Sequence, residues 1–413
     1  MNKEENQEKT PAIKFTSYQV FAITLLALTQ FTVVLDFMVM SPLGDRLMKS
    51  MDLTTSQFGA SVGAYAISAF ASGLLTAGFA DKFDRKKLLM FFYIGFILGT
   101  LFCGLSTSYP MLLAARIITG IFGGVIGSIS MAIVADLFPI NQRGRVMGFM
   151  QMGFGASQVL GIPISLYLAN HWGWQSPFLM IVGLASLVLM LLAIKMQPIV
   201  EHLDKKSETN PFLHLWKTIK NRNYRIGFLT TAMLSLGGFM MMPWGSAFAI
   251  NNLKITNEQL PILFMVAGVA TLLIMPIIGK ISDIANKFTI FTFASVWMMI
   301  VVVIYTNMSE TPLWLVMIVN VAMMIGIMGR MVPAMALVTA LPEMHDRGAF
   351  MSINSSLQQL AGGIASIIGG MIVVQKTKFS PLEHYNTLGY VVLVFALINI
   401  FMLYRVSKLA KVK

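Results

Sequence analysis

The chain has 413 residues, of which 56% are apolar and only 12% are charged, against a usual charged share of ~25% in soluble proteins. So few charges exclude a water-soluble globule of this size, and the many apolar residues exclude a disordered chain. The composition therefore indicates a protein embedded in lipid. The net charge is nonetheless +12. Basic loops on one side of a membrane and binding to nucleic acid would each explain this excess.

Apolar segments long enough to cross a bilayer follow one another along the chain. A hydrocarbon core of ~30 Å takes about 20 apolar residues of helix per crossing. None of the segments shows the period-two alternation of a membrane β-strand. The sequence therefore predicts an all-α membrane protein with twelve transmembrane helices. The predicted spans are 18–40, 58–80, 88–106, 110–137, 146–169, 175–196, 226–250, 260–281, 288–306, 312–340, 349–374 and 387–404.

Basic residues are distributed unevenly over the predicted loops. With the N-terminus placed inside, 23 of the 30 Lys and Arg residues fall in the tails and inner loops. Those on the opposite side are Arg46, Lys49, Lys254, Lys376 and Lys378. Cytoplasmic loops carry such an excess. We therefore expect a multi-pass protein of the plasma (inner) membrane with both termini in the cytoplasm, and no nucleic-acid partner.

Two loop motifs of the first half recur in the second half. AGFADKFDRKK (77–87) after the second span is echoed by GKISDIANK (279–287) after the eighth. LFPINQRG (137–144) after the fourth span is echoed by LPEMHDRG (341–348) after the tenth. Transporters are commonly built from such repeats, with the binding site between them. The sequence therefore predicts two pseudo-symmetric six-helix bundles.

The longest polar stretch separates these two bundles. We expect the bundles at 18–196 and 226–404, and a cytoplasmic linker at 197–225 that contains an amphipathic segment on the inner membrane surface. The cytoplasmic tails are then 1–17 and 405–413.

These motifs resemble those of the major facilitator superfamily, and the resemblance covers the whole chain. The family signature G-x-x-x-D-R-x-G-R-K appears as A-G-F-A-D-K-F-D-R-K at 77–86, and R-x-x-Q-G appears as R-I-I-T-G at 116–120. The first half is similar to the twelve-span drug–proton antiporters. In the fifth span, G-I-P at 161–163 is closer to the G-x-P form of sugar- and metabolite-efflux members. The resemblance implies a transporter with the major facilitator fold.

Three charged residues lie well inside predicted spans, namely Asp36, Arg116 and Arg330. At ~1.5 Å per residue, Asp36 and Arg116 are both ~8 Å below the outer edge. Burial favours a neutral carboxylic acid and a nearby cation favours the carboxylate, so a change in their separation would change proton affinity. We predict that Asp36 is a protonation site balanced by Arg116. The alternative is a static structural pair.

Arg330 has no acidic residue at its depth in the C-terminal spans. Two interpretations stay open. It is either an anchor for an anionic group on the substrate, or an arginine satisfied by helix carbonyls or by Asp36. The resemblance places spans 1, 4, 7 and 10, which hold all three buried charges, around the central cavity.

Other candidates for the substrate cavity are polar or aromatic residues within spans. Gln158 and Gln358 occupy comparable places in spans 5 and 11. Phe239 and Trp244 lie in a Met-rich part of span 7, and Met40 ends span 1. Met side chains adapt to varied apolar ligands. The alternative for each residue is ordinary packing or hydrogen bonding between helices.

The repeated inner loops predict a cytoplasmic gate. Asp81 is expected near the positive N-terminal end of span 11. The family pattern implies a pair between Arg85 and Asp136. The remaining gate candidates are Arg143, Asp283 and Arg347. The alternative is that all of these are solvated loop charges.

Signs of enzyme chemistry are missing from the sequence. There is no G-x-x-x-x-G-K-[ST] motif, the five His lack metal-ligand spacing, and no nucleophile–base arrangement occurs. We expect no enzyme activity, cofactor or metal.

The leading prediction is a secondary-active transporter that acts as a monomer. It is a proton-coupled antiporter that exports small amphipathic compounds by alternating access, with the substrate, protons and the lipid bilayer as partners. The alternative is a proton-coupled importer or facilitator of a polar or anionic metabolite. A non-transporting receptor would leave the buried charges and the paired loops unexplained.

Overall fold

The computed structural model describes residues 15–76, 80–200, 203 and 211–411. Apart from one isolated bridge between Val374 and Glu383, its regular structure is helical throughout the described part. The first half contains α1 (Ser17–Val39), α2 (Gly44–Met51), α3 (Thr55–Thr76), η1 (Ala80–Lys82), α4 (Arg85–Gly104), α5 (Tyr109–Leu137), α6 (Ile140–Ala156), η2 (Ser157–Gly161), α7 (Ile162–Trp172) and α8 (Ser176–Lys195). The second half contains α9 (Pro211–Lys220), α10 (Arg222–Phe239), η3 (Met242–Trp244), α11 (Gly245–Asn251), α12 (Leu260–Ile284), α13 (Lys287–Thr306), α14 (Leu313–Thr339), α15 (Arg347–Ile372) and α16 (Tyr385–Lys411).

Local sequence explains where several of these helices begin and break. Thr16 and Gln19 form a reciprocal capping box at the start of α1. Asn286 accepts hydrogen bonds from the first backbone amides of α13. The π turn η2 ends two residues before Pro163, and the break at η3 contains Pro243. Proline cannot donate a backbone hydrogen bond, so the helix geometry changes beside it.

Eleven helical segments of the described chain are long and apolar enough to cross a membrane. Two of them join several elements: Arg145–Trp172 continues from α6 through η2 into α7, and Arg222–Asn251 continues from α10 through η3 into α11. Helix α15 is not among the eleven although it has 26 residues. Its first half carries polar residues, including Asn354 and Gln358, that reduce its hydropathy.

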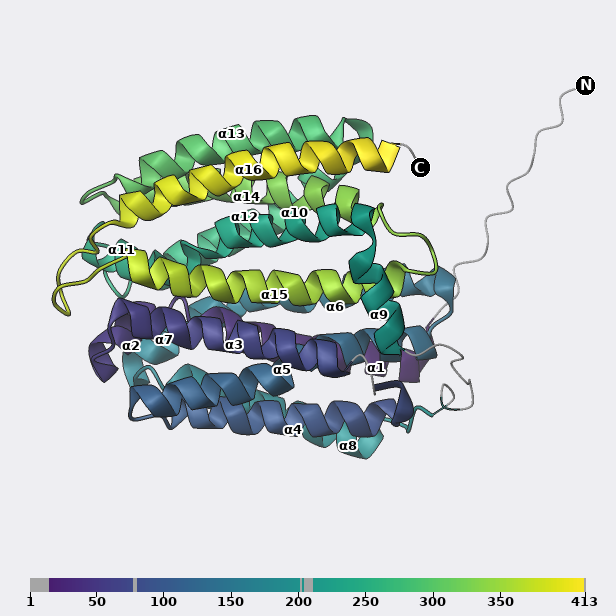
Figure 1. Cartoon of the computed structure of the whole chain (residues 1–413). Helices are drawn as coiled ribbons and strands as arrows, with labels where there is room; N and C mark the ends of the chain where they lie inside the picture. The colour runs from purple at the N-terminus through teal and green to yellow at the C-terminus, as the bar shows by residue number, and fades with distance from the viewer. Residues whose placement is uncertain (1–14, 77–79, 201–202, 204–210, 412–413) are drawn as a thin grey trace, which may run out of the picture.

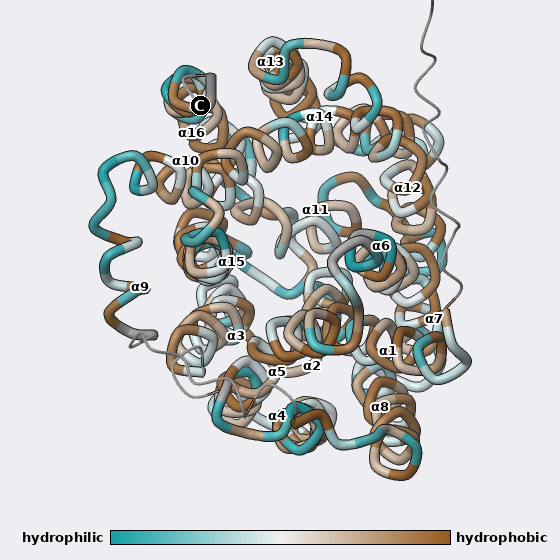
Figure 2. The backbone as a smooth tube through the Cα atoms, turned by 90° about the vertical axis from the view of Figure 1, so that its right-hand side faces the viewer, coloured by the Kyte–Doolittle hydropathy of each residue, from teal (hydrophilic) through white to brown (hydrophobic). Residues whose placement is uncertain are grey.

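The helices of the two halves form neighbouring groups that meet along α3 and α15. Figure 1 shows α1–α8 in purple to blue on one side and α10–α16 in green to yellow on the other, and the end-on view in Figure 2 agrees. Glycines allow α3 and α15 to approach closely. A Cβ atom on Gly59 would lie 2.6 Å from the carbonyl oxygen of Ser366. Small residues at such a crossing bring two backbones together.

The two ends of the molecule differ in how the halves are joined. Helices α2 and α11 lie at one end, here called the α2 end, whereas α9 lies at the other, the α9 end, where α1 begins and α16 ends (Figure 1). Hydrogen bonds between described residues of the two halves all lie at the α2 end. They join α2, the loop before it, α3 and α7 to η3, α11, α15 and the loops after α11 and α15.

Candidate functional site

A buried ion pair lies inside the first half, toward the α2 end. Arg116 Nη1 donates a hydrogen bond of 2.8 Å to Asp36 Oδ2, and both side chains have no exposed surface. Thr100 Oγ1 donates to the other carboxylate oxygen of Asp36 at 3.1 Å. Three helices thus meet at one carboxylate. Because neither side chain is exposed, the two charges depend on each other for compensation.

Helix packing fixes the positions of these groups. Asp36 is on the last turn of α1, Arg116 is on the second turn of α5, and Thr100 is near the end of α4. A Cβ atom on Gly99 would lie 2.6 Å from Thr119 Oγ1, so glycine lets α4 pack tightly against α5. Sequence reasoning identified the two charged residues and missed Thr100, whose single hydroxyl does not stand out in an apolar span.

Tyr65 of α3 is a second residue that the sequence did not reveal. Its ring centroid lies 4.6 Å from Arg116 Cζ, a cation–π contact. Arg116 Nε and Nη2 are buried and have no hydrogen-bond partner among the described residues. The guanidinium of Arg116 therefore contacts one carboxylate and one aromatic ring, and two of its nitrogens make no hydrogen bond with the described residues.

Aromatic rings connect this ion pair with the second half. The Tyr65 centroid lies 5.3 Å from that of Phe37, and Phe37 lies 6.2 Å from Phe239 of α10 in an edge-on contact. Phe239 in turn covers Gly362 of α15, where an added Cβ atom would lie 3.3 Å from its ring. Phe239, a predicted cavity residue, therefore lies where the two halves meet.

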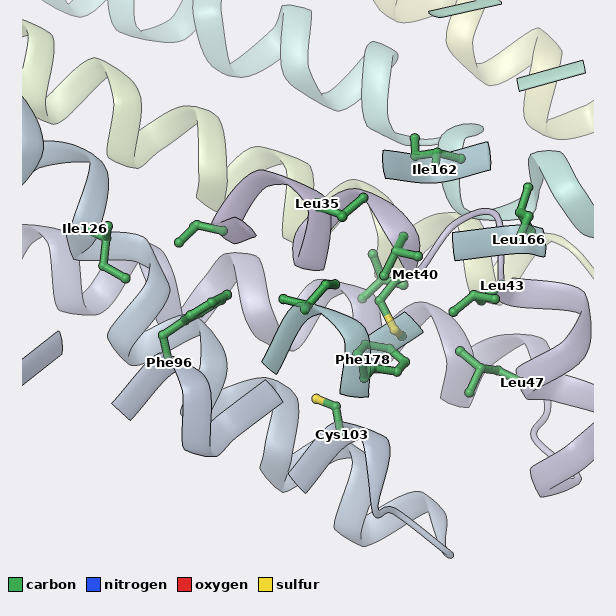
Figure 3. Close-up of a cluster of buried hydrophobic side chains, with 14 of the residues drawn as sticks. Leu35, Met40, Leu43, Leu47, Phe96, Cys103, Ile126, Ile162, Leu166 and Phe178 are labelled. Atoms are coloured by element: carbon green, nitrogen blue, oxygen red, sulfur yellow. The ribbon is translucent and has the colours of Figure 1, made fainter. Parts of the chain in front are cut away.

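Two other predicted cavity residues are fully buried in this conformation. Trp244 packs edge-on against Phe58 of α3, with centroids 5.5 Å apart, and adjoins Gly59. Figure 3 shows Met40 among buried apolar side chains that include Leu43. Both residues belong to the packed α2 end, because α1 and α10 stop there and their following turns contact the other half.

The two glutamines occupy different surroundings. Gln158 lies in the π turn η2, where its backbone contacts α12 at Gly268. Gln358 is exposed on α15. No hydrogen bond joins the two side chains, so this conformation does not bring together the pair expected from their comparable sequence positions.

Arg330 is buried within the second half. Its Nη1 lies 2.8 Å from Met298 Sδ, and its Cζ lies 5.5 Å from the centroid of Phe291. Both contacts belong to α13. Within the described part of the chain no carboxylate forms an ion pair with Arg330, and Asp36 pairs with Arg116 instead. A pair between Arg330 and Asp36, one of the expected alternatives, is therefore absent, because different bundles hold the two side chains.

The first-half loop motif forms a local network at the α9 end. Arg85 Nε donates to Asp136 Oδ2 at 3.1 Å, and Arg85 Nη1 donates to the carbonyl oxygen of Ala80 at 3.1 Å. Arg143 binds carbonyl oxygens at the end of α5, those of Ala135 at 2.5 Å and Phe138 at 2.9 Å. The side chain of Asp81 lies outside the described residues. These contacts tie loops to α5 within one half.

In the second-half loop, the acidic residue that forms contacts is not one of the predicted gate residues. Asp283 and Arg347 are exposed, and neither forms an ion pair with a described residue. Asp346, the residue before Arg347, accepts hydrogen bonds of 2.9 Å from His214 of α9 and from Tyr224 of α10. Burial raises the pKa of Asp346, but these hydrogen bonds outweigh it and leave the pKa below its ordinary value. The echoed motif contained this residue, but charge alone could not single it out.

A polar cluster at the α2 end joins the halves. Asn251 Nδ2 of α11 donates to Asp45 Oδ1 of α2 at 2.6 Å. Lys49 Nζ contacts Asp45 Oδ2 at 2.8 Å and Asn251 Oδ1 at 3.1 Å. We call these three residues the α2–α11 clamp. Sequence reasoning counted Lys49 only as an orientation charge, because its partner is 202 residues away.

The family model of the Major Facilitator Superfamily matches residues 26–366 and also residues 228–412. The chain belongs to this superfamily. The uncharacterized transporter YbcL of Bacillus subtilis is 24% identical over 92% of this chain and 95% of its own. The multidrug resistance protein fnx1 of Schizosaccharomyces pombe is 34% identical over 34% of this chain and 27% of its own. A probable sugar efflux transporter of Helicobacter pylori (strain P12) is 24% identical over 62% and 64%.

Solved structures support the same fold. A bacterial homolog of the human lysosomal transporter Spinster, inward-facing and unoccupied, has a TM-score of 0.78 at 16% identity and covers 96% of this chain and 98% of its own. A D-xylose–proton symporter has a TM-score of 0.74 at 17% identity and covers 94% and 97%. The chain is therefore an integral, multi-pass, all-helical membrane transporter with the fold of this superfamily, and it is not an enzyme.

Proposed function

We propose that this superfamily member is a proton-coupled antiporter that exports small amphipathic compounds by alternating access. The ion pair of Asp36 and Arg116 carries the proposal. A fully buried carboxylate beside one cation is a costly arrangement in a membrane protein, and such residues commonly mark proton pathways. The names of two relatives, a multidrug resistance protein and a probable sugar efflux transporter, favour export.

Coupling follows from the contacts of the pair. Protonation of Asp36 removes the charge that balances Arg116, and an uncompensated buried charge costs about 3–5 kcal/mol. This cost favours a rearrangement that gives the unused guanidinium donors a new partner. Tyr65 contacts Arg116, so its ring moves with the guanidinium, and Phe37 passes the change to Phe239.

Substrate binding is expected at this aromatic contact between the halves. Phe37 and Phe239 are only partly buried and offer apolar surface to an amphipathic compound. A compound that displaces these rings changes the surroundings of Arg116 and thereby the proton affinity of Asp36. Binding linkage is reciprocal, so protonation of Asp36 changes substrate affinity by the same factor.

The proposal also includes the arrangement in the membrane. We assign α15 as a further span in addition to the eleven, which gives twelve in total. Helix α1 begins and α16 ends at the same end of the molecule, and this requires an even number of crossings (Figure 1). The bundles are then 18–196 and 226–404, joined by the linker 197–225. The excess of basic loop residues makes the α9 end cytoplasmic in a plasma (inner) membrane. The hydrogen bonds between the halves close the opposite, outer α2 end, so the conformation is inward-facing. The transporter acts as a monomer.

Proton-coupled import of a polar metabolite is the second candidate. The structural similarity to a D-xylose–proton symporter favours it, and the same buried pair would serve either direction. Arg330 lends no support to an anionic substrate, because its guanidinium faces α13 in this conformation. A non-transporting receptor would have no use for a titrating buried pair.

Inverted membrane vesicles test the proposal. The full chain is energised with an inside-acid proton gradient, and a panel of cationic, neutral and anionic amphipathic compounds is added. Antiport predicts compound uptake with proton release, and the variant Asp36→Asn is expected to lose both while remaining in the membrane. Undiminished gradient-driven uptake by Asp36→Asn would refute the role of Asp36. Proton and compound movement in the same direction would establish the symporter, and flux without proton movement a facilitator.

A further inference from the structure

An apolar groove of about 440 Å³ runs along the outside of the second half, separate from the contact between α3 and α15. It lies where α12, α13 and α14 meet. Figure 2 shows α14 between α12 and α13, on the side of the molecule away from α9. The groove is lined by Ile281 of α12, Ala285 directly after it, Thr289, Phe293 and Trp297 of α13, and Gly329 of α14.

Small residues create the depth of this groove. A Cβ atom on Gly329 would lie 2.7 Å from Ala294 Cβ, and one on Gly326 would lie 2.9 Å from Met298 Cβ. These contacts hold α13 close to α14 and leave no side chain on Gly329 to fill the space above it. At the deep end, Trp297 Nε1 donates to the carbonyl oxygen of Ala322 at 2.8 Å, which fixes the indole.

The length of the groove matches one leaflet of a bilayer. It extends from Asn286, at the junction of α12 and α13, to Trp297 near the middle of α13. Eleven residues of helix span about 17 Å at 1.5 Å per residue. Half of a hydrocarbon core of ~30 Å is ~15 Å. The groove therefore begins at the membrane surface of the α9 end and stops near the midplane.

A lysine directly follows Asn286, the lining residue at the start of the groove. Lys287 is the first residue of α13 and shares a helix face with the lining residues Ile290 and Ala294, three and seven positions further on. The side chain of Asn286 is already used to cap α13, where it accepts from Phe288 N and Thr289 N. Lys280 and Asp283 are exposed on the adjoining end of α12. A lysine at this depth extends its amine toward the phosphate layer.

We propose that the groove binds one acyl chain of a phospholipid from the leaflet at the α9 end, with the phosphate at Lys287. The apolar walls match the chain, the length matches one leaflet, and the cation matches the phosphate. The site is separate from the proposed transport pathway, because its lining residues face outward from the second bundle. Its test does not depend on the substrate or on proton coupling.

Photo-crosslinking of the full chain tests this site. The protein is reconstituted with phosphatidylglycerol that carries a diazirine near the end of one acyl chain, and the labelled peptides are mapped by mass spectrometry. Because the diazirine is at the end of the chain, the label is expected to concentrate at the midplane end of the groove, on Phe293, Ala294, Trp297 and Ile325. The variant Thr289→Trp, which fills an exposed groove position, should lose most of this labelling. The control Val296→Trp places the same side chain on an exposed position of α13 outside the groove and should keep it.

A headgroup variant provides a second measurement that does not alter the groove wall. Lys287→Gln is expected to lower the amount of phospholipid retained by the purified protein in native mass spectrometry, whereas Lys408→Gln on α16 should not. An even distribution of label over other exposed apolar residues, such as Phe91 of α4, would overturn the proposal. So would unchanged labelling in Thr289→Trp, or crosslinks between two copies of the chain through the groove.

Discussion

Gly63 of α3 and Gly363 of α15 lie against each other's backbone at the crossing of the two halves. A Cβ atom on Gly63 would lie 2.6 Å from the carbonyl oxygen of Gly363, and one on Gly363 would lie 2.9 Å from that of Gly63. The two helices therefore touch through their backbones. A helix pair this close can roll or slide as a unit while the ends of the two halves open and close.

The first prediction concerns this crossing. Gly63→Ala should push α3 from α15 and lower the free energy of unfolding by about 1–3 kcal/mol, the usual cost of overpacking. Gly148→Ala is the matched control, because nothing lies within 4 Å of its added Cβ atom. The control should be neutral or slightly stabilising, since alanine favours helix. Thermal unfolding in detergent measures both, and equal melting temperatures would contradict the close contact.

The second prediction separates a titrating pair from a static one. Arg116→Gln alone leaves Asp36 buried without its cation and should cost about 3–5 kcal/mol. The double variant Asp36→Asn/Arg116→Gln removes both charges and should recover much of the thermal stability. It should not recover proton-coupled transport, because no titrating group remains. Full recovery of proton-driven transport in the double variant would show that the pair is only structural.

The third prediction concerns the α2–α11 clamp. Asn251→Ala removes the hydrogen bonds to Asp45 and Lys49, each worth about 0.5–1.5 kcal/mol or more for charged partners. The α2 end should therefore open more often. A cysteine introduced at buried Ser41 should react faster with an impermeant maleimide added from the α2 side. Asn307→Ala is the control, since Asn307 bonds only within the second half. Equal labelling rates would exclude a clamp.

The fourth prediction concerns pH and Asp346. The pKa of Asp346 is lowered in the folded state, so its stabilising contribution is complete above the ordinary value of 3.8 and is lost as pH falls toward the lower, folded-state pKa. Asp346→Asn should lower the melting temperature by a constant amount near neutral pH, and this difference should shrink below that value. Asp283→Asn, on an exposed side chain, should cause no change. A difference that does not shrink below pH 3.8 would contradict the assignment.

The fifth prediction concerns Arg330. Its described contacts are a thioether and an aromatic ring, so Arg330→Met preserves length and removes an uncompensated charge. Replacement of a buried charge by a well-packed apolar side chain is often neutral or stabilising. We expect an unchanged or higher melting temperature and unchanged affinity for neutral and anionic substrates. A loss of affinity confined to anionic substrates would show that Arg330 anchors them in another conformation.

Much of this protein is accessible from its sequence because a bilayer imposes simple rules. Apolar length predicted the eleven membrane-length helical segments of the described chain, the loop echoes indicated two related halves, and Asp36 was the one acidic residue well inside a predicted span. The predicted contact of Arg85 with Asp136 is present because a family motif fixes both positions. Helix α15 shows the limit of hydropathy, because polar residues lower its hydropathy although it packs closely against α3.

Tertiary structure decided which residues share a site. Thr100 and Tyr65 reach the ion pair only because α3, α4 and α5 converge on the end of α1, and nothing in their local sequence indicates this. The composition determined that the chain is a membrane protein, because the free energy of transfer into lipid is a sum over its residues. The hydrogen bond between Asn251 and Asp45 joins residues that are 206 positions apart in the chain. Contacts of this kind depend on how the two halves pack together, and only the folded structure specifies that geometry.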